Sequence, residues 1–243
     1  MPTVDAESSG VVSRVTDGDS IEVDAEGVST RVRLVAINTP DQGECYADTA
    51  LAHLAEIDGA TVRLEVMGTD QFGRTLAHVF EGDRHLNLEL VREGLAVAST
   101  PDADDPYGQA LLDAEDDAYA ERTGLWGAEA CGGSGEPPAV SFDVTSSVVD
   151  PVGPDDQNLG AEIVFIENRG NETVALDGWS LRDESTRHRY VFPEDSPIGP
   201  GEVIGVASDD PGWDPGGGPV WNNGGDLALL LDPMGTVVAR WRY

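Results

Sequence analysis

The sequence predicts a mainly β protein with helices, in which an OB-type barrel of the α+β kind precedes an immunoglobulin-like β-sandwich. Its 243 residues suggest one large domain or two small ones, at roughly 150 residues per domain. Residues 132–138 read Gly-Gly-Ser-Gly-Glu-Pro-Pro, which is a linker composition. Strong helical patterns occur only before this segment. We therefore expect a flexible lead over 1–10, a barrel domain over 11–131, a linker over 132–139 and a sandwich domain over 140–243.

The first half has the pattern of a small Greek-key barrel. Its β-branched runs are separated by tight Asp-Gly and Glu-Gly turns. The expected strands are 11–15, 21–23, 30–37, 61–66 and 74–80. The expected helices are 46–57, 88–93 and 107–123, and Gly94 and Gly124 close the last two. Short strands with a few interspersed helices are typical of an OB-type barrel.

The second half has no convincing helix and holds four of the five tryptophans. Its expected strands are 162–167, 174–176, 179–182, 188–192, 202–207, 227–231 and 237–241. Turn sequences such as Asn-Arg-Gly, Asp-Gly and Gly-Pro-Gly lie between them. About seven short strands in roughly a hundred residues predict an immunoglobulin-like sandwich, with the tryptophans mainly in its core.

The charge of the chain is strongly negative. It has 46 acidic and 14 basic residues, a formal net charge of −32, and no lysine, so every basic residue is an arginine. This charge argues against binding nucleic acid through a broad basic patch. In molar salt, however, the Debye length is only about 3 Å, so the summed negative field no longer acts at a distance. We interpret the composition as adaptation to high salt; the alternative is an acidic protein that lost its lysines by drift.

The two cysteines, Cys45 and Cys131, have no histidine or cysteine partner at zinc-ligand spacing, so we expect them to form a disulfide. A disulfide favours an oxidising compartment, and we expect an extracellular or cell-surface protein whose export signal is absent from this chain, with a cytoplasmic location as the alternative. No stretch approaches the roughly 20 apolar residues of a membrane span. The four histidines, His53, His78, His85 and His188, show no ligand spacing, so surface or packing roles are expected.

Polar residues that could do chemistry gather at turns and strand ends of the first half. They form the turn 17–20, Arg33 within a strand, the segment 38–41 after that strand, and the segment 70–74 before another strand. A buried arginine is costly unless it meets an anion, and two of them can hold a phosphate. Ca²⁺ takes oxygen ligands only, which the listed turn residues can supply from Asp19, Asn38 and Thr39.

Five pieces in order carry a resemblance to a known family. They are Asp17-Gly18-Asp19-Ser20-Ile21; Val32-Arg33-Leu34 running to Asn38-Thr39-Pro40-Asp41; Asp70-x-Phe72-Gly73-Arg74-x-Leu76-Ala77; Asn87-x-x-Leu90-Val91-x-x-Gly94-Leu95-Ala96; and Gly124-Leu125-Trp126. Over about residues 11–127 the chain resembles the thermonuclease, or micrococcal-nuclease-like, family. The resemblance implies an OB-fold nuclease barrel and Ca²⁺-dependent hydrolysis of phosphodiesters in DNA and RNA.

The resemblance also implies roles for single residues. Arg33 and Arg74 match the two catalytic arginines that clamp the phosphate. The implied calcium ligands are Asp19, Asn38 and Thr39. Electrostatic stabilisation of the phosphate oxygens is usually the largest catalytic contribution, so the arginines are expected to matter most.

Three positions depart from the family pattern. Asn38 replaces the usual aspartate, which removes a negative charge from the metal site. Asp41 stands where the family has the glutamate that orients or deprotonates the attacking water, and Glu44 is an alternative base if the loop folds back. Phe72 stands where a tyrosine is frequent, so it keeps an aromatic face for stacking on substrate but lacks the hydroxyl.

The second half resembles the lamin-tail family over about residues 140–243. The matching pieces are Glu162-Ile163-Val164-Phe165-Ile166-Glu167-Asn168-x-Gly170; Leu176-Asp177-Gly178-Trp179-x-Leu181-x-Asp183; Pro200-Gly201; Trp221-Asn222-Asn223-x-x-Asp226-x-Ala228-x-Leu230; and Gly235-Thr236-Val237-Val238. The resemblance implies a β-sandwich and leaves its partner unknown.

The sequence as a whole predicts a secreted, salt-adapted, calcium-dependent nuclease that acts as a monomer on DNA, RNA or both. One alternative is a catalytically weak nucleic-acid-binding or cell-envelope-associated protein that retains the nuclease fold; another is a purely structural surface protein. The presence of both Arg33 and Arg74 favours the enzyme, because a protein that no longer cleaves phosphodiesters has little need of the pair.

Overall fold

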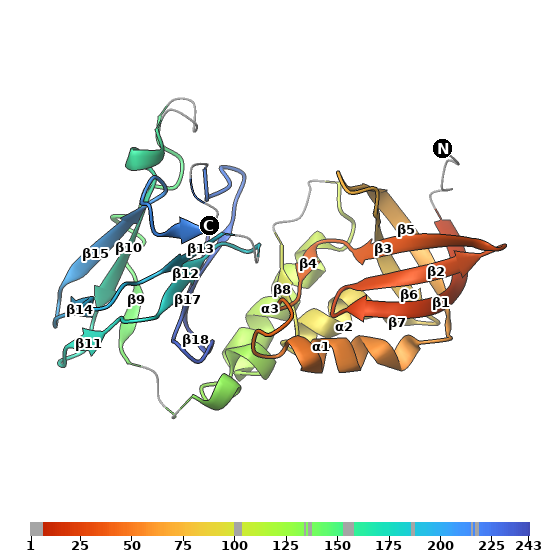
Figure 1. Ribbon diagram of the computed structural model, residues 1–243, viewed down its shortest axis with the longest axis horizontal. Coiled ribbons are helices and arrows are strands. Elements are labelled where there is room, and N and C mark those ends of the chain that lie inside the picture. Colours follow the sequence, from red (N-terminus) through yellow and green to blue (C-terminus); the bar gives the residue numbers. More distant parts are fainter. Residues whose placement is uncertain are drawn as a thin grey trace. The chain divides into compact units, whose positions relative to one another are not determined.

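The computed structural model describes residues 7–99, 104–133, 135, 138–152, 158–185, 188–214, 216 and 219–243. It divides into two compact units, Met1–Trp126 and Gly127–Tyr243, whose elements are labelled in Figure 1. Each unit has a hydrophobic core of its own. Of the predicted linker, residues 134, 136 and 137 lie outside the described residues, as do residues 1–6 of the predicted lead.

The first unit is built on a closed barrel. Its strands are β1 (Glu7–Asp17), β2 (Ser20–Ala25), β3 (Val28–Leu34), β4 (Ile37–Asn38), β5 (Thr61–Thr69), β6 (Thr75–Glu81), β7 (Arg84–His85) and β8 (Val97–Ala98). The sheet order is β3-β2-β1-β5-β6-β7, and a parallel pairing of β3 with β6 closes five of these strands on themselves. The short strands β4 and β8 pair separately. The predicted OB-type barrel is therefore confirmed.

Strand β1 starts earlier than the sequence predicted. Residues 7–10, which were assigned to the flexible lead, pair with β5 as part of the strand. Gly10 lets β1 approach β2 closely, because a Cβ atom there would lie 2.6 Å from a methyl carbon of Val23. Two register shifts, between Val12 and Arg14 and between Val15 and Asp17, bend the strand, and such bulges help a sheet to close.

Helices cover the barrel and complete its core. They are α1 (Ala47–Leu54), continued by a 3₁₀ turn at Ala55–Ile57, α2 (Leu86–Arg92), and α3 (Gly108–Glu121), followed by a 3₁₀ turn at Gly124–Trp126. Leu54, Leu90 and Leu111 bring one buried side chain from each helix to the same core as the inward-facing barrel residues. Burying such side chains supplies the main free energy of folding.

Two glycines join the ends of α2 and α3. Gly94 and Gly124 both have positive φ, 63° and 57°, and a Cβ on either would lie within 2.4 Å of backbone oxygen. The Leu125 N–H donates to the Gly94 carbonyl at 2.8 Å. Gly94 and Gly124 therefore end the two helices, as predicted, and also allow a close backbone contact between them that no other residue could make.

The second unit is a β-sandwich, as predicted. Its strands are β9 (Val140–Phe142), β10 (Ile163–Asn168), β11 (Val174–Ala175), β12 (Ser180–Arg182), β13 (Arg189–Val191), β14 (Pro197–Ile198), β15 (Val203–Ala207), β16 (Trp213–Asp214), β17 (Leu227–Leu231) and β18 (Val237–Arg242). A five-stranded sheet, β16-β13-β12-β17-β18, accompanies the three-stranded sheet β15-β10-β9 and the pair β11-β14. Short 3₁₀ turns lie at Ala130–Gly132 and Leu159–Ala161.

Side chains from the sheets form the core of the sandwich. Trp179, Trp213 and Trp221 are buried in it, as the sequence predicted for most tryptophans. The second unit begins at Gly127, before the predicted linker. The Thr236 hydroxyl donates to the Ala130 carbonyl at 2.7 Å, which ties this early segment to the sandwich. Within the described part of the chain, no helix is both long enough and apolar enough to cross a membrane.

Candidate active site

The turn between β1 and β2 sets up the site. The Asp19 N–H donates to the Asp17 carboxylate at 3.0 Å, which is an Asx turn. Gly18 lies against the segment after β4, since a Cβ there would come within 2.7 Å of the Thr39 Oγ1 atom. The turn can therefore approach Thr39 only because residue 18 has no side chain.

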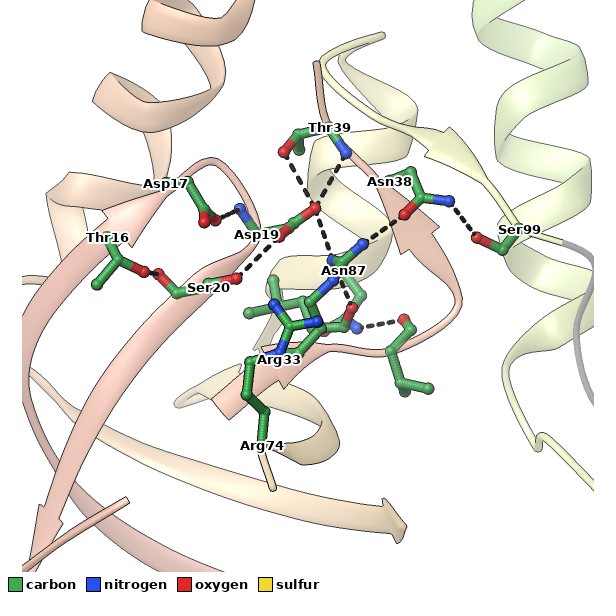
Figure 2. Close-up of polar contacts among 12 residues, drawn as sticks. Thr16, Asp17, Asp19, Ser20, Arg33, Asn38, Thr39, Arg74, Asn87 and Ser99 are labelled. Carbon is green, nitrogen blue, oxygen red and sulfur yellow. Dashed lines mark hydrogen bonds and ion pairs between the residues drawn. The ribbon is translucent and has the colours of Figure 1, made fainter. Parts of the chain in front are cut away.

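Asp19 is the centre of the group (Figure 2). Its carboxylate is buried, with Oδ2 accepting from both the Thr39 N–H and the Thr39 hydroxyl at 3.1 Å and Oδ1 accepting from the Ser20 hydroxyl at 3.0 Å. The Arg33 Nη1 atom lies 2.6 Å from Oδ2. Burial raises the pKa of Asp19 above its ordinary value, and the Arg33 guanidinium acts in the opposite direction.

Arg33 is the residue before the last one of β3, nearer the strand end than the sequence indicated. Its guanidinium lies between two partners, with Nη1 on the Asp19 carboxylate and Nη2 donating to the Asn38 Oδ1 atom. The arginine side chain is mostly buried, and its charge is met by an acid, which satisfies the condition for burying it.

Asn38 is held by the pairing of β4 with β8. It lies opposite Val97, and its side-chain amide donates to the Ser99 hydroxyl at 2.9 Å. The Ser99 N–H in turn donates to the Ala36 carbonyl at 2.9 Å. The carbonyl oxygen of the Asn38 amide therefore points at Arg33, and its nitrogen points at Ser99 (Figure 2).

Arg74 lies directly before β6, the parallel neighbour of β3. Arg33 pairs with Leu76, two residues after Arg74, and Figure 2 shows the Arg74 side chain extending towards Arg33. Asp70 holds Arg74 through an ion pair of 2.7 Å. Partial burial acts to raise the pKa of Asp70, but hydrogen bonds from Arg74 and from the Phe72 N–H lower it overall. Phe72 is exposed, and the Arg74 guanidinium carbon lies 5.8 Å from its ring centre.

Asp41 and Glu44 belong to the next turn along the chain. The Asp41 N–H donates to the Glu44 carboxylate at 3.0 Å, and the Glu44 N–H donates back to the Asp41 carbonyl at 2.9 Å. Glu44 is thus turned towards the Asp41 main chain, and the Asp41 side chain remains exposed, while the role of either as a base stays a prediction. The structure joins Asp19, Arg33, Asn38 and Thr39 in one hydrogen-bonded group and joins Asp41 with Glu44 in another.

Asn87 is a positioning residue for which the sequence gave a motif position but no role. It is fully buried on α2, accepts from the Val79 N–H at 3.0 Å, and donates to the Val35 carbonyl at 2.8 Å. It therefore fastens the chain after β3 to β6, the two strands that bring Arg33 and Arg74 together. Glu115, also fully buried, accepts from the Ala98 N–H at 2.7 Å and supports β8 behind Asn38.

The oxygens around Asp19 suit a hard divalent cation in chemical kind. Asp19 offers a carboxylate, Asn38 an amide oxygen, and Thr39 a hydroxyl or main-chain carbonyl, which are the ligand types of Ca²⁺. The contacts of Arg33 with both Asp19 and Asn38 mean that two of these oxygens already face one positive charge. The residues present therefore match calcium in ligand type, with a single carboxylate in the set, and an ion bound there would share these oxygens with Arg33.

Both cysteines, Cys45 and Cys131, are disulfide-bonded, and since the chain has only two, the predicted disulfide is confirmed. His78 of β6 and His85 of β7 lie 3.1 Å apart between Nδ1 and Nε2, which is a packing role of the kind expected. His53 lies beside Glu89 of α2 and Glu93 directly after it, a grouping that was not expected. The sequence separations of these residues gave no sign of either arrangement, because the barrel and its helices bring distant positions together.

Comparisons with known proteins agree with this geometry. The family described as Staphylococcal nuclease homologue matches residues 31–128, and the Lamin Tail Domain matches residues 137–243. A thermonuclease of Staphylococcus intermedius is 34% identical over 128 residues, which are 48% of this chain and 74% of the relative. A micrococcal nuclease of Shigella flexneri is 32% identical over 134 residues, 50% of this chain and 75% of the relative.

An uncharacterized endonuclease of Haemophilus influenzae is 32% identical over 117 residues, covering 47% of this chain and 64% of the relative. The matched residues 31–128 include Arg33, Asn38, Thr39 and Arg74, and they end near the C-terminal edge of the barrel unit. The barrel, the arginine pair at the end of β3 and directly before β6, and these relatives lead to one assignment: the chain belongs to the family of staphylococcal nuclease homologues and carries a lamin tail domain after its nuclease domain.

Proposed function

We propose that this nuclease hydrolyses phosphodiester bonds of DNA, RNA or both, that it uses Ca²⁺, and that it is adapted to high salt. One observation carries the proposal: the Arg33 guanidinium lies at the end of β3 between two oxygen ligands, and Arg74 enters the parallel neighbouring strand. The names of the relatives, thermonuclease, micrococcal nuclease and endonuclease, support a nucleic-acid substrate.

The two arginines bind and orient the phosphate. Each guanidinium offers paired N–H donors that match two phosphate oxygens, and each stabilises the negative charge that develops on them during cleavage. Asp19 and Asp70 hold Arg33 and Arg74 in place before substrate arrives. A phosphate that carries its own charge competes with these carboxylates for the guanidinium N–H groups.

The remaining roles follow from the chemistry of the nearby groups. Asp41, or Glu44 in its place, accepts a proton from the attacking water. Asp19, Asn38 and Thr39 hold the calcium ion, which when bound supplies positive charge for the phosphate and the water. Phe72, exposed next to Arg74, offers an aromatic face on which a base can stack.

Cleavage assays with a chelator arm test this function. Single-stranded DNA and RNA are incubated with the full chain in molar salt with Ca²⁺, with Mg²⁺, and with a chelator. We expect cleavage with Ca²⁺ and its loss with the chelator. Absence of cleavage in every salt and with every divalent ion would reject the nuclease, whereas cleavage that survives the chelator would reject calcium dependence alone.

The cellular location of the protein is a separate part of the proposal. We propose that the protein acts as a monomer outside the cell or at its surface, because a disulfide persists in oxidising compartments. Protein recovered from the culture medium and from the cell interior is alkylated without reduction and weighed. Oxidised Cys45 and Cys131 in the medium support the proposal, while accumulation of a dithiol form inside the cell would contradict it.

A further inference from the structure

Outside the candidate active site, helices α1 and α2 bring together one histidine and two glutamates. His53 lies in the last turn of α1, Glu89 lies in α2, and Glu93 follows directly after α2. The His53 Nε2 atom is 3.6 Å from the Glu89 Oε1 atom, and Nδ1 is 3.3 Å from the Glu93 Oε2 atom. One ligand atom from each residue can be chosen so that all three lie within 4.8 Å of one another.

One nitrogen of the His53 imidazole has no hydrogen-bond partner. Its Nε2 atom is buried and makes no hydrogen bond, although the ring is 14% exposed. An imidazole with a single N–H leaves one of its two nitrogens with a lone pair that faces a carboxylate oxygen. Two acceptors then face each other with no hydrogen between them, an arrangement that a cation placed between them relieves.

The local charge also favours a cation. Glu89 forms a two-point contact with Arg84, with distances of 3.0 and 2.7 Å, and Arg84 also lies near Glu81 and Glu56. The charged groups linked to one another through His53, Glu89 and Arg84 are therefore four carboxylates, Glu56, Glu81, Glu89 and Glu93, and two guanidinium groups, Arg84 and Arg92. This leaves an excess of two negative charges, which one divalent ion balances.

We propose that His53, Glu89 and Glu93 bind a divalent transition-metal ion of the Zn²⁺ type. An imidazole nitrogen with two carboxylate oxygens suits Zn²⁺ and its neighbours in the first transition row, whereas Ca²⁺ takes oxygens alone. Bonds of about 2.0–2.2 Å place two ligands of a tetrahedral ion roughly 3.3–3.6 Å apart, which matches the separation of the His53 and Glu89 atoms. Arg84 orients the Glu89 carboxylate from outside the ligand set.

The site lies away from the candidate active site, so its expected role is to stabilise the fold. Its ligands come from two helices, while the candidate active site is built from the β1–β2 turn, β3, β4 and the entry to β6. A metal shared by α1 and α2 holds the second helix in place, and α2 carries Asn87, which fastens β3 to β6. Binding therefore stabilises the folded barrel, since a ligand that binds only the folded state raises its melting temperature.

Cobalt spectroscopy on the full chain tests the proposal. Metal-free protein in high-salt buffer with excess Ca²⁺, which occupies oxygen-only sites, is titrated with Co²⁺ while visible absorbance is recorded. We expect one Co²⁺ per chain, with the intense bands of four-coordinate cobalt, its displacement by Zn²⁺, and a higher melting temperature. The variants His53→Gln and Glu93→Gln each weaken Co²⁺ binding by at least about tenfold.

Matched controls separate this site from the general negative charge. His188→Gln changes a histidine of the other unit, Glu121→Gln changes an exposed carboxylate of α3, and both retain Co²⁺ binding like the unaltered chain. The proposal is overturned if the unaltered chain gives only weak six-coordinate bands, or if both site variants bind as tightly as the controls do. Glu93 is half exposed, so its variant keeps the fold and the test stands even if the His53 variant does not fold. Cleavage is not the readout, so the outcome is independent of the nuclease function.

Discussion

At the scale of single residues, each arginine of the candidate active site is paired with an aspartate. Arg33 touches an acid and an amide oxygen, Arg74 touches Asp70, and Asp19 accepts from three different residues. These contacts keep each side chain in one orientation before substrate arrives, which is what electrostatic catalysis requires. The arginines are therefore the residues whose removal is most informative.

Replacing either arginine tests the phosphate clamp. Arg33→Ala and Arg74→Ala are each expected to lower kcat by about a hundredfold to a thousandfold, because each removes a charge that meets the developing anion. Arg33→Ala also lowers the melting temperature, since the buried Asp19 loses its cation, while Arg74→Ala leaves it nearly unchanged. The measurements are single-strand cleavage and circular dichroism. Arg14→Ala, an exposed arginine of β1, is the control, and near-normal turnover of either site variant contradicts the clamp.

Restoring a carboxylate at position 38 tests the metal ligands. Asn38→Asp is expected to tighten Ca²⁺ binding by about tenfold, or ~1.4 kcal/mol, because it adds a second negative charge beside Asp19. Calorimetric titration of Ca²⁺ into the folded protein measures the change. Asn38→Ala, which removes the amide without adding charge, is the comparison and is expected to bind more weakly than the unaltered chain. Equal affinities for all three proteins would exclude residue 38 from the calcium site.

Individual residues were predictable to different degrees. The motif order predicted Asp19, Arg33, Asn38 and Thr39 as a set, and the structure joins them, while their catalytic roles stay a prediction. Ser99 could not be predicted as the partner of Asn38, because that contact spans 61 residues and depends on the pairing of β4 with β8.

At the scale of elements, α2 acts on the site through Asn87. Asn87→Ala removes the partners of a buried N–H on β6 and of the Val35 carbonyl, so we expect a loss of about 2–4 kcal/mol in the free energy of unfolding. Denaturant unfolding followed by fluorescence measures it. Glu121→Ala on the exposed face of α3 is the matched control and is expected to change stability very little. A loss no larger than in the control would contradict the fastening role.

The histidine pair on β6 and β7 gives the barrel a pH response. Burial, together with the charge of His78, lowers the pKa of His85 from 6.5 to about 4, and burial also lowers the pKa of His78. The unfolded chain therefore binds more protons than the folded barrel between about pH 4 and 6.5, so stability falls as the pH is lowered through that window. Denaturant unfolding at pH 7, 6 and 5 measures the fall.

The variant His85→Gln isolates the contribution of that ring. It is expected to flatten the pH dependence of barrel unfolding, whereas His188→Gln in the sandwich leaves the slope of the barrel transition unchanged. Equal slopes for the His85 variant and the unaltered chain would show that another group dominates.

The elements themselves were mostly predictable. The five long barrel strands and three helices of the first unit were all present, as were the seven strands expected in the second, of which β11 has only two residues. The three-residue strand β9 and two-residue strands such as β4, β8, β14 and β16 were missed, because so few residues contain no periodicity and form strands only through their partners. The helix expected at 88–93 begins two residues earlier at Leu86, since no capping side chain marks its start.

At the scale of the whole molecule, the charge of −32 predicts that the protein needs high salt for activity and stability. In dilute buffer the acids repel one another and the substrate, and in molar salt this repulsion is screened. We expect kcat/KM on DNA and the melting temperature both to rise between 0.1 and 3 M KCl. A neutral osmolyte at the same osmolality should not replace the salt. Full activity and stability in dilute buffer would contradict salt adaptation.

The contacts around Asp19 bear on when the barrel can fold and when the protein becomes active. Because Arg33, Ser20 and Thr39 satisfy this buried carboxylate from within the chain, the barrel can fold without waiting for an ion to arrive. Under the proposed calcium dependence, folding and activation are separate events, and a cell could complete the enzyme where free calcium is scarce, with cleavage expected to begin only when calcium is met.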